Sequence, residues 1–117
     1  MIKKVKIPII NSSFDLYVGD IHENTKLVDQ KYGTKIGDDI RDDTVGFVYV
    51  LPFDKGCEQY MLFLPENAAI KIVMHEALHL SWFMLDTYGI IVEAHNHEIL
   101  AYLQGFITER ILKILAE

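Results

Sequence analysis

Two histidines four residues apart, with a glutamate directly after the first, occur in the segment His75-Glu76-Ala77-Leu78-His79. Residues four apart lie on the same face of an α-helix, with Cβ atoms about 5–6 Å apart. On a helix, His75 and His79 would direct two imidazoles at one ion, and zinc–nitrogen distances of about 2.0–2.1 Å are within reach. The segment therefore predicts a metal centre, with zinc as the expected ion.

Glu76 has a different role from the two histidines in this interpretation. Consecutive residues are rotated by about 100° around a helix, so Glu76 cannot easily join the same ligand set. Its carboxylate can reach a water molecule held by the metal, which suits a general base. The spacing thus predicts His75 and His79 as metal ligands and Glu76 as the catalytic residue.

Two other interpretations of the histidine pair need no metal. The pattern arises by chance in on the order of one chain in a hundred. Alternatively, the histidines belong to the core and are satisfied by hydrogen bonds. The sequence around them is apolar nearly all round a helix, so we expect this helix to be buried. Burying two imidazoles and a carboxylate is costly without partners, which favours the metal interpretation.

A catalytic zinc site usually has three protein ligands, which leave one position for water. The candidates downstream of the pair are Asp86, Glu93, His95, His97 and Glu98. Asp86 lies about two turns beyond His79 and points away from the ion. Glu98 falls in the first turn of a second predicted helix and is the preferred third ligand; His95 and His97 come next.

A stripe of Glu98, Ala101, Tyr102 and Gly105 supports this choice, because these residues share one helical face. Small residues at 101 and 105 would let this helix pack closely on its neighbour, and a glycine inside a helix suggests a packing reason. If this face points toward the histidines, the Glu98 carboxylate lies close enough to bind the metal. The alternative is a first-turn glutamate that only favours the helix dipole.

The elements that must position these residues follow from hydrophobic periodicity. Strands are predicted at 2–10, 14–18, 45–51 and 59–64, with a further strand-like run at 90–92. Residues 11–13 form the first hairpin connection and residues 54–56 the turn of the second. Helices are predicted at 21–32, 67–86 and 96–116, with Asn67 as an N-cap. Strands followed by two long helices indicate an α+β fold: a mostly antiparallel N-terminal sheet and two packed helices.

Length and composition limit the classes of protein. The chain has 117 residues, of which 50% are hydrophobic, so we expect one domain spanning 1–117. A net charge of −6 without a basic stripe argues against nucleic acid as a partner. The single cysteine, Cys57, excludes an internal disulfide and a thiolate zinc cluster. With neither a signal peptide nor a membrane-length apolar run, we expect a cytoplasmic protein.

The acidic, glycine-rich segment 33–46 is predicted to be an exposed loop. A calcium site is the functional alternative there, but the spacing of its oxygen ligands fits no familiar calcium loop.

The sequence resembles a zincin metallopeptidase, and more closely the gluzincin branch. The resemblance rests on the segment 75–79 and on Asn96-His97-Glu98-Ile99-Leu100-Ala101-Tyr102, and it covers about residues 60–116. It implies that His75, His79 and Glu98 bind Zn²⁺ and that Glu76 activates water. It further implies a peptide or protein substrate held as an added β-strand along an edge strand of the sheet, near 59–64. Small single-domain metallopeptidases of phage and bacteria are similar too.

The chain also departs from well-studied gluzincins. Those proteins are far larger, with a second domain forming one wall of the cleft, and an acidic residue often follows the third ligand where Ala101-Tyr102 stands here. The leading interpretation is zinc-dependent peptide-bond hydrolysis. The alternative is a non-catalytic, zinc-stabilised binding or regulatory module whose metal clamps the two long helices. A third is an α+β domain without metal. The sequence assigns neither a specific substrate nor an oligomeric state.

Overall fold

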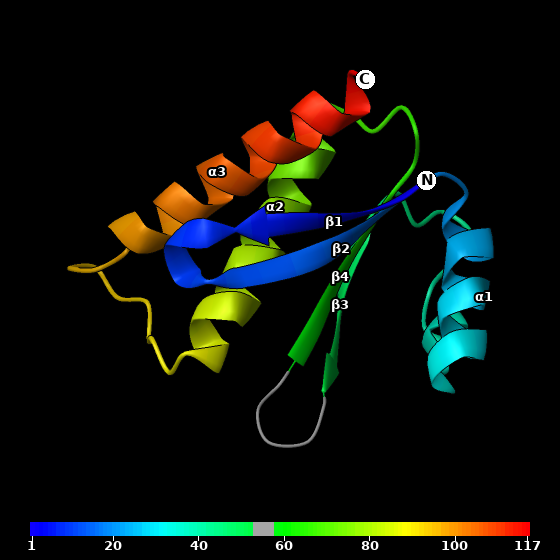
Figure 1. Ribbon diagram of the computed structural model, residues 1–117, viewed down its shortest axis with the longest axis horizontal. Helices are drawn as coiled ribbons and strands as arrows, with labels where there is room; N and C mark the ends of the chain where they lie inside the picture. Colours follow the sequence, from blue (N-terminus) through cyan, green and yellow to red (C-terminus); the bar gives the residue numbers. More distant parts are fainter. Residues whose placement is uncertain (53–57) are drawn as a thin grey trace.

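The computed structural model describes residues 1–52 and 58–117 and arranges them as a sheet with helices on both faces (Figure 1). The strand order is β1-β2-β4-β3, with β1 and β2 antiparallel, β2 and β4 parallel, and β4 and β3 antiparallel. The elements are β1 (Ile2–Ile7), β2 (Ser12–Val18), α1 (Ile21–Tyr32), β3 (Phe47–Pro52), β4 (Glu58–Leu64), α2 (Ile70–Thr87) and α3 (Glu98–Leu115). The predicted α+β fold is confirmed, while the turn at 54–56 and Cys57 lie outside the described residues.

The central strand is β4, which pairs with β2 on one side and β3 on the other. Its side chains alternate between the two faces of the sheet: Tyr60, Leu62 and Leu64 point one way, Met61 and Phe63 the other, and all five are buried. Burial on both faces explains its continuous apolar run. Because β4 is paired on both sides, the prediction that 59–64 is an edge strand is wrong; β3 occupies that edge.

The two faces of the sheet carry separate cores. On one face, α2 and α3 pack on a large cluster that includes the inward residues of the strands. On the other, α1 covers a smaller cluster in which Tyr17, Phe63 and Phe47 stack across three neighbouring strands, with ring centroids 4.7 and 4.4 Å apart. Stacked aromatic pairs of this kind add to the stabilisation from burial alone. In Figure 1, α1 stands apart from the α2–α3 pair.

Local sequence signals explain several boundaries. The hairpin between β1 and β2 is confirmed, but its connection lies at 8–11: Pro8 starts a short 3₁₀ turn, and Asn11 adopts a left-handed conformation with φ 48°. The helix α1 begins after Asp20, whose side chain accepts a hydrogen bond from the Glu23 N–H, and ends at Gly33 with φ 68°. The sequence therefore predicted α1 at its correct bounds.

Two predictions around the long helices are wrong. The helix α2 starts at Ile70, not Asn67, and within the described chain its N-cap residue, Ala69, makes no side-chain capping bond. The run 90–92 belongs to the α2–α3 connection and forms no strand; Ile90 and Val92 are apolar because they pack against the core. Across residues 1–52 and 58–117, no helix combines the length and apolar character that a membrane crossing needs.

Candidate metal centre

The imidazoles of His75 and His79 face each other one turn apart on α2. Their Nε2 atoms are 3.1 Å apart, and the rings meet edge to face with centroids separated by 4.7 Å. Both residues are exposed, and 65% of the His75 side-chain surface is accessible. The four-residue spacing thus brings the two nitrogens together on the solvent side of the helix.

This nitrogen–nitrogen distance fits a shared metal ion. Two nitrogens about 2.05 Å from one zinc ion and 3.1 Å apart subtend an angle of about 98°, near the roughly 109° of a tetrahedral site. The same distance also fits a hydrogen bond between two neutral imidazoles, one of which carries its proton on Nε2. The distance is therefore compatible with a shared zinc ion and equally compatible with a hydrogen bond between the two rings.

The expectation that α2 is buried nearly all round is wrong. Its core-facing stripe is Val73, Ala77, Leu80 and Met84, whereas several large apolar side chains lie exposed: Ile70, Met74, Leu78, Trp82 and Phe83. One side of α2 packs on the sheet and α3, and no described element covers the other. Because the two imidazoles are exposed, the cost of burying them no longer supports the metal interpretation. Of the three residues, only Glu76 is buried, so the burial argument now applies to it alone.

Glu76 points away from solvent, toward the side of α2 that packs on β3 and β4. The residue is only 6% exposed, and its Oε2 lies 3.9 Å from Nε2 of His75. Among the described residues, no hydrogen-bond donor reaches its carboxylate. Burial raises the pKa of the Glu76 carboxyl above its usual value, and the nearby His75 and His79 draw it partly back.

Glu76 is not completely enclosed, because 8% of its side-chain surface remains accessible. Within the described chain, the Thr108 hydroxyl is the one fully covered side-chain polar atom without a hydrogen-bond partner. A largely buried carboxylate 3.9 Å from Nε2 of His75 is near enough to act on a molecule held by that histidine, which suits a general base.

Glu98 is the first residue of α3 and is exposed. Its helix packs against α2, and the Gln104 side chain donates a hydrogen bond of 3.0 Å to the Met74 carbonyl. In the described part of the chain, however, no three His, Cys, Asp or Glu side chains are arranged to hold one metal ion. The structure brings His75, His79 and Glu76 together, and the assignment of Glu98 as third ligand stays a prediction.

The predicted reason for the stripe on α3 is wrong. Ala101, Tyr102 and Gly105 are exposed, and a Cβ added at Gly105 would meet no atom within 4 Å. The inward side of α3 is taken by Leu103, Ile107, Ile111 and Ile114, as their apolar spacing predicts. The small residues therefore do not mediate close packing of α3 on α2.

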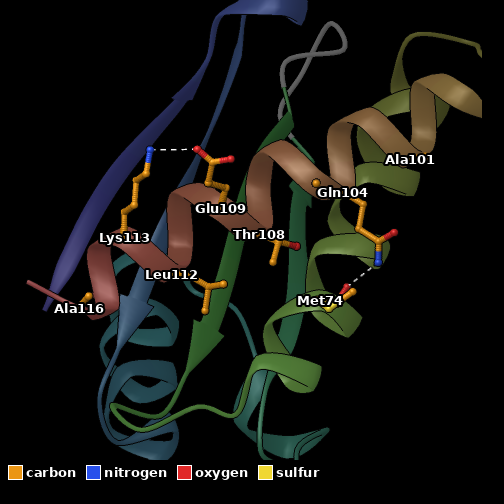
Figure 2. Close-up of a pocket in the computed structure, with 9 residues that line it drawn as sticks. Met74, Ala101, Gln104, Thr108, Glu109, Leu112, Lys113 and Ala116 are labelled. Atoms are coloured by element: carbon orange, nitrogen blue, oxygen red, sulfur yellow. Dashed lines mark hydrogen bonds and ion pairs between the residues drawn. The ribbon is translucent and has the colours of Figure 1, made fainter.

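The small residues instead border an open groove of about 630 Å³ that runs along α3 and includes Met74 of α2 (Figure 2). Apolar atoms dominate its surface, and the ion pair between Glu109 and Lys113, 2.9 Å long, lies on it. It is lined by Met74, Ala101, Gln104, Gly105, Thr108, Glu109, Leu112, Lys113 and Ala116. Met74, which lines the groove, directly precedes His75 in the chain, but neither histidine of the pair lines it.

The other candidate ligands lie in or near the connection between the helices. His95 Nδ1 is 3.3 Å from a Glu93 carboxylate oxygen, and both side chains are largely exposed. His97 occupies the N-cap position of α3, and Asp86 is exposed near the end of α2. None of the four forms a ligand group with His75 and His79 among the residues that the structure describes.

Gly46 directly precedes β3 and lies against Glu76, a contact that the sequence did not predict. A Cβ built on Gly46 would be 3.2 Å from Cγ of Glu76. Gly46 falls inside the predicted strand 45–51, and a glycine within a strand is the available signal, because it often marks a close approach of another element.

No protein-family model matches this chain, and neither a curated protein nor a solved structure is significantly similar to it. The function must therefore be argued from the residues themselves.

Proposed function

We propose that this chain is a zinc-dependent metallopeptidase whose metal is held by His75 and His79, with Glu98 as third ligand. The observation that carries the proposal is the Nε2–Nε2 distance of 3.1 Å on an exposed helical face, with the largely buried Glu76 carboxylate 3.9 Å from Nε2 of His75. Two nitrogens at a metal-compatible distance and a base at their side are the components that metal-assisted hydrolysis requires.

Each residue has a distinct role in the proposed reaction. A zinc ion lowers the pKa of a bound water and polarises a peptide carbonyl. His75 and His79 would hold the ion through their Nε2 atoms and fix its place on α2. Glu76 would accept the proton of the attacking water and return it to the departing amine, so that the peptide bond is replaced by an acid and an amine.

The proposed substrate is a peptide or protein segment, and β3 rather than β4 is the strand available to it. Among the described strands, β3 pairs with β4 alone, so its outer edge offers free main-chain donors and acceptors. The helix α2 packs against β3, and Gly46 at the start of this strand lies against Glu76. A peptide added along β3 would pass close to the proposed base.

The first test is the zinc content of untagged protein, measured by elemental analysis. We expect about one zinc per chain, on the basis of one histidine pair. His75→Ala should lose the metal, whereas His22→Ala, which changes an exposed histidine on α1, should keep it. Absence of zinc uptake near neutral pH, or equal zinc content in wild type and His75→Ala, would refute the proposal.

The rival function is a zinc-stabilised binding module without turnover. It is favoured by the position of Glu98 at the start of α3, because an ion shared by Glu98 and the pair on α2 would clamp the two helices together. X-ray absorption spectroscopy of the zinc-loaded protein separates the two functions. A water ligand indicates the peptidase, and a fourth protein ligand such as His95 or His97 indicates the module.

A further inference from the structure

We infer that Gly46 is a positioning residue that holds the Glu76 carboxylate in place beside the histidine pair. The inference rests on the proposed function, because it concerns the base of the same site. Gly46 is not among the glycines with positive φ, which are Gly19, Gly33 and Gly89. Its backbone therefore does not demand glycine, and the reason for glycine must lie in the surrounding space.

The space around Gly46 is filled on three sides. A Cβ at this position would lie 3.2 Å from Cγ of Glu76, 3.2 Å from Cγ2 of Ile72 and 3.3 Å from Cδ2 of Leu64. These distances are shorter than ordinary van der Waals contacts of about 3.5–4.0 Å. Gly46 thus packs closely against the Glu76 side chain and leaves too little space for a methyl group unless a neighbour moves.

The three neighbours differ in how easily they can retreat. Leu64 is fully buried in the central strand, and Ile72 packs against the same core. Close-packed core side chains resist displacement. The Glu76 stem ends in a carboxylate that no described donor holds, so it is the group that yields. A methyl group at position 46 would therefore move the carboxylate while leaving the histidines, which point to solvent, in place.

The variant Gly46→Ala tests this inference with readouts that a merely structural change would not produce. We expect the zinc content to stay near that of wild type and hydrolysis of a mixed peptide library to fall roughly tenfold, because small displacements of catalytic groups are costly. The affinity of acetohydroxamate for the zinc-loaded protein gives a second readout without turnover. This probe needs an open metal position and a neighbouring carboxylate, so Gly46→Ala and Glu76→Gln should both weaken its binding.

The matched control is Gly105→Ala, the same chemical change where a Cβ meets no atom within 4 Å. Its zinc content, hydrolysis and acetohydroxamate affinity should equal those of wild type. In a Glu76→Gln background, Gly46→Ala should weaken acetohydroxamate binding no further, because Gly46 acts through Glu76. If Gly46→Ala alone folds poorly, Leu64→Val is added, which removes the Cδ2 atom that the new methyl group would meet.

The outcomes separate the inference from the proposed function. Wild-type behaviour of Gly46→Ala, equal weakening in the Glu76→Gln background, or loss of zinc in Gly46→Ala would each overturn the inference and leave the peptidase proposal standing. A wild type that binds zinc but cleaves no peptide, with acetohydroxamate binding weakened in both variants, would overturn the peptidase and support the inference. A wild type without zinc would overturn both.

Discussion

Two carboxylates of this chain, Glu76 on α2 and Asp29 on α1, lie in opposite surroundings. Asp29 accepts hydrogen bonds from the Thr34 hydroxyl and from the backbone N–H groups of Ile36 and Gly37, the latter two 2.8 and 2.9 Å long. Glu76 is buried beside His75, and no described donor reaches its oxygens. Three donors surround the Asp29 carboxylate, whereas none of the described residues donates a hydrogen bond to Glu76.

Their pKa values shift in opposite directions for this reason. Partial burial alone would raise the pKa of Asp29, but the three hydrogen bonds outweigh it and hold the pKa below its usual value. Burial raises the pKa of Glu76, and His75 and His79 compensate only in part. A carboxylate that accepts hydrogen bonds from a loop is stabilised in its charged form, whereas a general base must be able to accept a proton. The difference agrees with a structural role for Asp29 and with the proposed role of Glu76 as a base.

The largest expected effect is that of Glu76→Gln on hydrolysis. The amide keeps the size of the side chain but cannot accept the proton of water, so turnover should fall by about 10²–10⁴-fold with one zinc still bound. Initial rates and zinc content measured on the same samples check this. Retained activity in Glu76→Gln would exclude Glu76 as the base.

A smaller effect is expected for Asp29→Ala, and it concerns stability. Removing the carboxylate leaves the N–H groups of Ile36 and Gly37 without their acceptor, which should lower the free energy of unfolding by about 1–3 kcal/mol. Urea denaturation measures the change, and zinc content should be unaltered. Asp42→Ala, at an exposed position in the same loop region, is the control and should change stability by less than about 0.5 kcal/mol.

The fold was predictable because its signals are local and repeated. The alternating and continuous apolar runs identify β3 and β4, and Asp20 and Gly33 mark the ends of α1. The order of strands in the sheet depends on contacts between distant segments. The sequence of 58–64 does not show that β4 pairs in parallel with β2, so the edge strand was assigned wrongly. Apolar composition likewise could not show that α2 leaves Leu78 and Trp82 in solvent.

The candidate site likewise has parts that local geometry determines and parts that depend on long-range packing. The spacing of His75 and His79 on one helix fixes their proximity, since it depends only on helical geometry. The placement of Glu98 depends on how α3 packs on α2, which the small residues 101 and 105 were wrongly expected to decide. The role of Gly46 was not predicted because Gly46 and Glu76, which are in contact, lie 30 positions apart in the chain.

The smallest effect, and the sharpest test of the comparison, is the pH dependence of stability at Asp29. Its folded-state pKa lies below the unfolded value, so the charged form binds its donors more tightly than the protonated form does. The resulting stabilisation is fully present above the unfolded pKa of about 3.9 and is lost as the pH falls through the lower, folded-state pKa. The difference in unfolding free energy between wild type and Asp29→Asn should therefore shrink as the pH is lowered from 6 toward 3, at the constant ionic strength needed to hold screening fixed. A difference that stays constant over this range would mean that the hydrogen bonds to Asp29 do not depend on its charge, and the contrast with Glu76 would then lose its electrostatic basis.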